Sequence, residues 1–106
     1  MAKIVGAKAS EMVIMNSLTV NLHLMMVSFY NPVKGRSKIL IEYSTFPSDV
    51  YAVKSQIRFH GFNPETDLLF LKPKRNSSLI TRDDIDEMLA IHGDEIALIM
   101  IVGVNY

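Results

Sequence analysis

The spacing of apolar residues along the chain predicts three helices. From Leu18 to Tyr30 the apolar side chains recur at intervals of three and four residues, which is typical of a helix with one apolar stripe. A second helix is predicted from Pro47 to about His60, and a third follows Thr81 and ends at Gly93. The stripes consist of Leu18, Leu22, Met25, Met26 and Phe29 in the first helix, and of Ile85, Met88, Leu89 and His92 in the third.

Four short apolar runs predict strands, because each is bounded by polar residues and is too short for a typical helix. The last run is the most apolar in the chain, and we expect it to form a central parallel strand covered on both faces. Strands that alternate with helices in this way predict an α/β fold with a mainly parallel sheet and helices on both faces. The four runs are Glu11 to Met15, Lys38 to Tyr43, Leu68 to Leu71 and Ile96 to Val102.

Residues with strong conformational preferences mark where these elements begin and end. Pro47 suits a first helical turn, since its missing amide would have no partner there. Thr81 and Asp84 resemble a capping box with aspartate in the usual glutamate position, and Asn16 or Ser17 can cap the first helix. The other predicted boundaries are Asn31-Pro32, the exposed turn Lys34 to Arg36, Gly61, the turn Asn63 to Thr66, and the polar loop Lys72 to Ser78.

Two junctions between a strand and a helix carry the candidate chemistry of the chain. In open α/β sheets, ligands bind outside the carboxyl ends of the strands, and the segments Asn16 to Thr19 and Phe46 to Asp49 occupy such positions. We therefore interpret them as two walls of one cofactor site. The amides of Leu18 and Thr19 and the threonine hydroxyl can hold a phosphate, as helix N-termini do. On the residues alone, ordinary capping remains the alternative for the first junction. For the second, a core position for the aromatic ring and a helix-start charge for the carboxylate remain open.

Composition narrows the classes of function. The 106 residues include 11 basic and 11 acidic side chains, so no net charge points to nucleic acid or an acidic membrane as a partner. The chain has no cysteine, which excludes disulfides and thiolate catalysis, and no apolar run approaches the roughly 20 residues that span a bilayer. Because His23, His60 and His92 lack metal-ligand spacing, we expect no metal site, and we interpret the chain as cytoplasmic.

The last residues bear on domain organisation. Tyr106 closely follows the most apolar predicted strand, and no further helix follows to cover that strand. A complete doubly wound domain would rarely end there, so we expect residues 1–106 to be a piece of a larger α/β domain. Taken alone, such a piece would expose a large apolar sheet face.

Several motifs resemble those of kynureninases. The first is Met15 to Leu24, with the sequence MNSLTVNLHL, and the second is Phe46-Pro47-Ser48-Asp49 with the following Tyr51-Ala52 and Ser55-Gln56. With His60-Gly61, Lys72-Pro73 and Gly103-Val104, the similarity covers nearly all of the chain. Kynureninases are cytoplasmic, homodimeric pyridoxal 5′-phosphate enzymes of the aspartate aminotransferase fold type. They hydrolyse L-kynurenine or 3-hydroxykynurenine to anthranilate or 3-hydroxyanthranilate and L-alanine, in tryptophan catabolism and NAD biosynthesis.

The resemblance implies roles for the residues that match the family's motifs. Leu18 and Thr19 would bind the cofactor phosphate, and the second motif would supply an aromatic ring stacked on the pyridine and a carboxylate that hydrogen-bonds near it. The family usually has a phosphate-contacting serine at the position of Val102, which has no hydroxyl. The cofactor-binding residues implied by the resemblance are Leu18, Thr19, Phe46, Pro47, Ser48 and Asp49.

Other parts of the family's site correspond to sequence beyond Tyr106. These are the Schiff-base lysine, the C-terminal half of the large domain and the small domain, and neither Lys54 nor Lys72 matches the Schiff-base position. We therefore expect residues 1–106 to be a partial cofactor domain of a kynureninase, with no catalytic residue and no activity alone. A different class of function remains open, namely a non-catalytic α/β binding or regulatory module that retains only the phosphate-holding half of the site.

Overall fold

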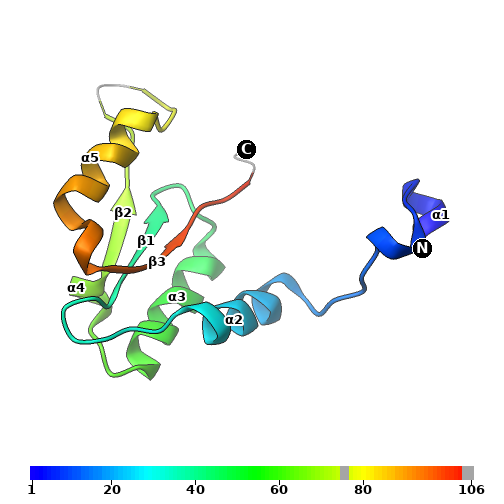
Figure 1. The fold of residues 1–106 in the computed structure, drawn as a ribbon, viewed down its shortest axis with the longest axis horizontal. Helices are drawn as coiled ribbons and strands as arrows, with labels where there is room; N and C mark the ends of the chain where they lie inside the picture. Colours follow the sequence, from blue (N-terminus) through cyan, green and yellow to red (C-terminus); the bar gives the residue numbers. More distant parts are fainter. Residues whose placement is uncertain (75–76, 104–106) are drawn as a thin grey trace.

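The computed structural model of the chain describes residues 1–74 and 77–103. Three parallel strands form one sheet in the order β2-β1-β3, and three long helices pack around it (Figure 1), which confirms the predicted α/β class. Arg75 and Asn76 of the predicted polar loop, and Val104 to Tyr106, lie outside the described residues. The strands are β1 (Lys38–Glu42), β2 (Leu68–Leu71) and β3 (Ile96–Met100), the long helices are α2 (Leu18–Phe29), α3 (Pro47–Phe59) and α5 (Arg82–His92), and the short helical turns are α1 (Ala2–Val5), η1 (Ala9–Glu11), α4 (Pro64–Asp67) and η2 (Gly93–Glu95).

The central strand β1 forms the middle of the core. Its residues Ile39, Leu40 and Ile41 are fully buried, because α2 and α3 cover one face of the sheet and α5 covers the other. Ile39 lies opposite Leu68 of β2 and Leu98 of β3, so both neighbours are in parallel register with it. Burying an isoleucine side chain stabilises the fold by about 1.5 to 3 kcal/mol, which makes this strand the main anchor of the helices.

Most helix boundaries agree with the predictions. α3 begins with Pro47 and ends before His60 and Gly61, whose φ of 82° is the left-handed conformation that glycine tolerates. Thr81 and Asp84 form the predicted capping box at α5, where hydrogen bonds from the Thr81 amide and hydroxyl hold the pKa of Asp84 below its usual range. Gly93 also follows its helix, but its φ of −54° continues into the turn η2.

Two local predictions were wrong in detail. Ser17 occupies the N-cap position of α2, but neither it nor Asn16 makes the predicted side-chain cap, and the Asn21 side-chain amide donates to the Asn16 carbonyl instead (2.8 Å). The turn predicted from Asn63 to Thr66 is the start of the short helix α4, because the Asn63 side chain accepts a hydrogen bond from the Glu65 amide (3.0 Å).

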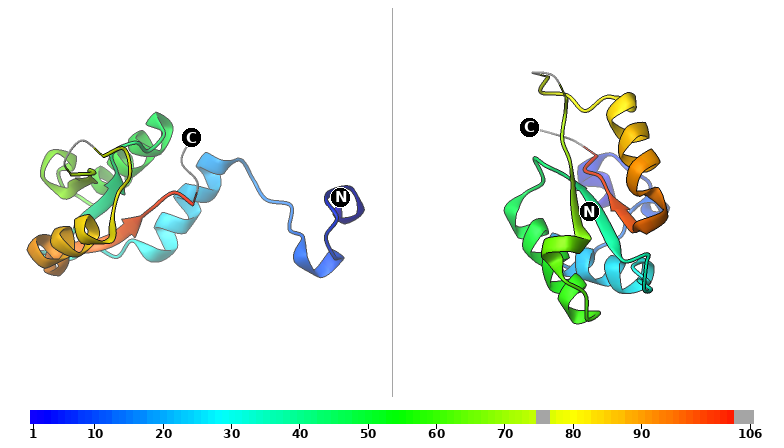
Figure 2. Two further views of the ribbon diagram at one scale, coloured as in Figure 1. Left: turned by 90° about the horizontal axis from the view of Figure 1, so that it is seen from above. Right: turned by 90° about the vertical axis from the view of Figure 1, so that its left-hand side faces the viewer.

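The strand predicted from Glu11 to Met15 is not formed. Val13 and Ile14 are 72% and 83% exposed, and the segment before α2 reaches away from the body of the molecule (Figures 1 and 2). Glu11 instead closes the turn η1 by accepting a hydrogen bond from the Lys8 amide (2.8 Å). An apolar run becomes a strand only where another strand offers hydrogen bonds, and none of β1 to β3 pairs with it.

The prediction of a central position for the last strand was also wrong. β3 lies at one edge of the three described strands and ends at Met100, so Ile99 and Ile101 are about half exposed. The apolar stripe predicted for α2 is also only partly covered: Leu22 and Met26 pack on the sheet, whereas Leu18, Met25 and Phe29 are exposed.

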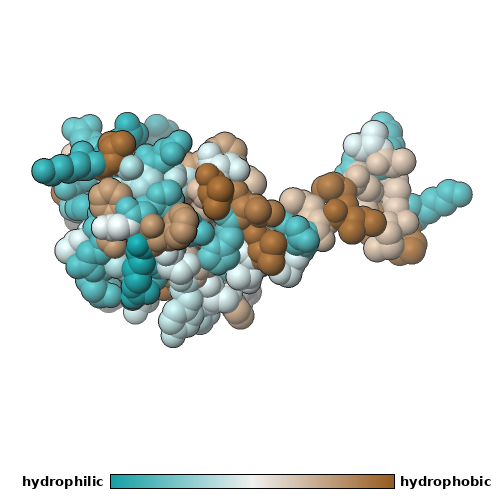
Figure 3. Space-filling model, turned by 90° about the horizontal axis from the view of Figure 1, so that it is seen from below, coloured by the Kyte–Doolittle hydropathy of each residue, from teal (hydrophilic) through white to brown (hydrophobic). Residues whose placement is uncertain are grey.

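The apolar surface that is exposed lies along the edge of the sheet and not on a sheet face, since α2 and α3 cover one face and α5 covers the other. A groove of about 350 Å³ between α2 and β3 is lined by apolar residues that include Met25, Phe29 and Ile99. Figure 3 shows further apolar side chains gathered on the N-terminal segment and where that segment meets the body. Across the described residues, none of the helices combines the length and apolar character that a membrane crossing requires.

Candidate functional site

The start of α2 presents free hydrogen-bond donors. The amides of the first turn of any helix have no partner within the helix, and here the N-cap residue Ser17 does not use its hydroxyl to satisfy them. Leu18 and Thr19, the first two helical residues, are both exposed. Because the helix dipole adds partial positive charge at this end, the amides and the Thr19 hydroxyl form a suitable site for an anion such as phosphate.

The start of α3 presents an open aromatic ring beside a carboxylate. Phe46 is the N-cap residue and is 54% exposed, so the alternative of a core position for this ring is not realised. Pro47 is exposed, and the half-buried Ser48 and Asp49 lie side by side, with the Ser48 hydroxyl 3.4 Å from the Asp49 carboxylate. The ring is thus available to cover a flat ligand, and the Asp49 carboxylate, an acceptor group, follows three residues later along the chain.

Thr45 is a feature of this junction that the sequence reasoning did not single out. It directly precedes Phe46, it is buried, and its hydroxyl has no hydrogen-bond partner among the described residues. A buried hydroxyl without a partner costs about 1 to 3 kcal/mol. No motif marks such a residue in advance, because only the folded arrangement decides which polar atoms are left unpaired.

The two helix starts lie at the same end of the molecule. His23 of α2 and Gln56 of α3 are joined by a hydrogen bond between Nδ1 and Nε2 (2.8 Å). Further along both helices, the ring of Tyr30 meets the ring of His60 edge to face, with centroids 5.1 Å apart. The contacts advance in the same direction along the two chains, so the helices run roughly parallel and begin on the same side (Figure 1).

The helical period places Thr19 and Asp49 on the helix faces that carry this hydrogen bond. Thr19 precedes His23 by four residues, so it lies on the same face of α2, about 6 Å closer to the helix start. Asp49 precedes Gln56 by seven residues, which is about two turns or roughly 10 Å along α3. In the described parts of the chain, no hydrogen bond links Thr19 to Asp49, and the two starts are held together through the bodies of the helices.

The lysines of the chain lie elsewhere. The amine of Lys54 is 3.5 Å from the Glu65 carboxylate, and the amine of Lys72 lies 4.5 Å from the centre of the Tyr43 ring. All seven lysines fall within the described residues, and none belongs to either junction. Val102, the position at which a serine was expected from the resemblance, lies two residues beyond the end of β3.

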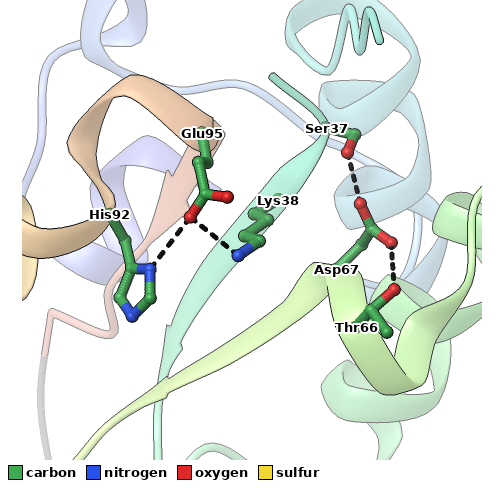
Figure 4. A network of polar contacts seen from close by, with 6 residues as sticks. All are labelled: Ser37, Lys38, Thr66, Asp67, His92 and Glu95. Carbon is green, nitrogen blue, oxygen red and sulfur yellow. Dashed lines mark hydrogen bonds and ion pairs between the residues drawn. The ribbon is translucent and has the colours of Figure 1, made fainter. Parts of the chain in front are cut away.

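A network of polar contacts lies at the start of β1, the end of this strand away from the segment Phe46 to Asp49 (Figure 4). Lys38, the first residue of β1, and His92 both bond the Glu95 carboxylate (2.8 and 3.0 Å), and together they hold the pKa of Glu95 below its usual range. Asp67 accepts hydrogen bonds from the hydroxyls of Ser37 and Thr66. Because these groups are paired with one another and lie away from the helix starts, we assign them to the stability of the fold.

Buried Tyr30 belongs to the same end of the molecule. Its hydroxyl donates to the carbonyl of Ser37 (2.7 Å), which ties the end of α2 to the start of β1. Burial, assisted by the nearby negative charge of Asp67, raises the pKa of Tyr30 to about 12. The neutral form of this phenol is therefore strongly preferred in the folded chain.

Comparison with known proteins gives one consistent result. No family model matches the chain. A kynureninase from Koribacter versatilis is 57% identical over 105 residues, and one from Myxococcus xanthus is 54% identical over 105 residues; each alignment covers 99% of this chain and 25% of the relative. A kynureninase from Dictyostelium discoideum is 47% identical over 106 residues, which are all of this chain and 24% of the relative.

The similarity runs from one end of the chain to the other, across bacteria and a eukaryote, and it includes both helix starts. The chain spans about a quarter of the length of the curated relatives it matches. By sequence, these 106 residues belong to the kynureninase family and correspond to one segment of its members.

Proposed function

We propose that this chain is the part of a kynureninase that holds the phosphate and one face of the ring of pyridoxal 5′-phosphate. The observation that carries the proposal is the common orientation of α2 and α3, which begin at the same end with free amides on one helix and an open aromatic ring on the other. The residues that would hold the cofactor are Leu18, Thr19, Phe46, Pro47, Ser48 and Asp49.

The groups present fit this cofactor. The exposed start of α2 suits a phosphate, since helix amides and the dipole both favour an anion. The exposed ring of Phe46 can exclude water from one face of a planar ligand, and the Asp49 carboxylate can accept a hydrogen bond near the ring. When bound, pyridoxal phosphate supplies an electron sink, and the role of this chain is to bind and orient it.

The activity of the whole protein follows from the family and is part of the same proposal. We propose that the complete enzyme hydrolyses L-kynurenine or 3-hydroxykynurenine to an anthranilate and L-alanine, in tryptophan catabolism and NAD biosynthesis, as a cytoplasmic homodimer. Residues 1–106 would then be part of its large domain. The alternative of a free-standing binding or regulatory module gains no support, because the relatives at 47% to 57% identity are named kynureninases.

We further propose that the 106 residues alone do not turn over kynurenine. The basis is that neither junction contains a lysine, while Lys54, within α3, and Lys72, directly after β2, contact Glu65 and Tyr43 instead. The chain can therefore hold the cofactor without forming a covalent bond to it. Release of anthranilate from L-kynurenine by the purified chain with added pyridoxal phosphate, measured by fluorescence, would contradict this part of the proposal.

Binding can be tested with pyridoxamine 5′-phosphate, which has the phosphate and the ring but no aldehyde to react with surface lysines. In a two-dimensional ¹H–¹⁵N spectrum of the chain, we expect the amide signals of Leu18 and Thr19 to shift with ligand concentration. Pyridoxamine without the phosphate is the matched control and should leave these signals in place. Shifts confined to other parts of the chain, or no shifts, would contradict the proposed site.

A further inference from the structure

We propose that His23 and Gln56 form a positioning pair, which fixes the position of the start of α2 relative to the start of α3 along the helix axes and so shapes the proposed cofactor site. The inference rests on the proposed function and deepens it. Neither residue would touch the cofactor, because both lie along the helices beyond the residues assigned to binding. Their hydrogen bond (2.8 Å) would act through Thr19 on α2 and through Asp49 on α3.

The polar character of the pair is unusual for its surroundings. Leu22 and Met26 of α2 and Val53 and Ile57 of α3 join the apolar cluster beneath the sheet, and Gln56 is itself buried at 8% exposure. Burying an amide is unfavourable unless it is hydrogen-bonded. A polar pair at such a position therefore lowers stability relative to apolar packing. It fixes the relative position of the two helices instead, because a hydrogen bond requires a defined distance and angle.

The hydrogen bond also defines the state of the imidazole. The Gln56 amide nitrogen faces Nδ1 of His23 and can only donate, so this arrangement makes Nδ1 the acceptor and leaves the ring proton on Nε2. The Gln56 oxygen is left buried without a partner among the described residues. An unpaired buried oxygen means that the site is not optimised for stability alone, and this favours a positioning role for the pair.

The pair lies where a small displacement of α2 along α3 would change the proposed site. Apolar packing by itself allows neighbouring helices several registers, and a shift along the axis would move the α2 amides relative to the Phe46 ring. His23 is one turn from Thr19, so the hydrogen bond controls register close to the proposed phosphate site.

The experiment compares ligand affinity with stability in matched variants of the 106-residue chain. His23→Leu and Gln56→Leu remove the hydrogen bond, the double variant tests whether the residues act as a unit, and His23→Gln keeps a side chain that can bond Gln56. Val53→Ala is the control, since it removes buried apolar contacts of α3 and leaves both members of the pair unchanged. Affinity for pyridoxamine 5′-phosphate is measured by titration of the amide spectrum at a temperature at which every variant is folded.

We expect each leucine variant to weaken binding by about fivefold or more, and the double variant to be no weaker than the single variants, as coupled residues behave. His23→Gln should restore most of the affinity, and Val53→Ala should lower the melting temperature without weakening binding. The ¹⁵N shifts of His23 should show the proton on Nε2.

Each other outcome contradicts a distinct statement. If the wild-type chain does not bind pyridoxamine 5′-phosphate, the proposed function is wrong for this chain and the inference falls with it. If the wild type binds and the leucine variants bind equally well, or lose no more affinity than Val53→Ala, the positioning role is wrong and the proposed function stands. If a leucine variant does not fold, His23→Gln and the tautomer decide: failure to restore binding, or a proton on Nδ1, overturns the inference.

Discussion

Replacing Tyr30 by phenylalanine should change how the stability of the chain responds to alkaline pH. The hydroxyl of Tyr30 is buried, donates to the Ser37 carbonyl, and has a pKa raised to about 12 from an ordinary value of 10.0. Because the folded state retains this proton after the unfolded chain has lost it, the contribution of the phenol is complete below pH 10. It is lost as the pH rises from about 10 to about 12.

The magnitude follows from the difference between the two pKa values. Two pKa units correspond to about 2.7 kcal/mol at full titration, and roughly half of this is lost by pH 11. Tyr30→Phe removes the hydrogen bond to Ser37 (2.7 Å), which costs about 1 kcal/mol at neutral pH, but the variant has no phenol to titrate. The two stability curves should therefore cross near pH 11, above which the variant is the more stable chain.

The assay is urea unfolding followed by circular dichroism, at intervals from pH 8 to pH 11.5. All other residues are the same in both chains, so the difference between the two free energies of unfolding isolates Tyr30. Tyr51→Phe is the control, because Tyr51 is 74% exposed and should give a difference close to zero at every pH. A difference between the wild type and Tyr30→Phe that stays constant with pH would refute the reasoning.

Three further predictions concern stability. Glu95→Gln should make the free energy of unfolding less dependent on pH on the acid side. The pKa of the Glu95 carboxylate is lowered, mainly by Lys38, so this group stabilises the fold above its ordinary pKa and loses that contribution as the pH falls through the lowered value. An unchanged acid profile in urea unfolding would contradict this. Thr81→Ala should remove the capping box of α5 and destabilise the chain by about 1 kcal/mol, seen as a lower melting temperature, whereas Thr81→Ser should retain most of it. Ile41→Ala should lower the free energy of unfolding by about 2 to 5 kcal/mol, because the Ile41 side chain is fully buried. Val13→Ala, on the exposed segment, should change it by less than about 0.5 kcal/mol. Similar losses in both variants would mean that the exposed segment packs on the body.

Both candidate helix starts could be located from the sequence, since their signals are local. Pro47 and Ser17 mark the first turns, and the structure begins α3 and α2 beside them. We expected the two starts to share one site because each would follow a strand, but the strand predicted before Asn16 is not formed. Their common orientation depends on contacts between segments far apart in the sequence, such as His23 with Gln56. The roles assigned to Thr19 and Asp49 in binding stay predictions until a ligand is measured.

The sequence by itself determined the secondary elements whose hydrogen bonds are local. The capping box of Thr81, the helix end at Gly61 and the buried run of β1 all follow from neighbouring residues, because helix caps, turns and apolar periodicity act over a few positions. Only the tertiary structure decided whether the other apolar runs form strands and where those strands lie in the sheet. Residues 11–15 have the composition of a strand but no strand beside them, and β3 lies at an edge of the described sheet because a strand's position depends on its partners.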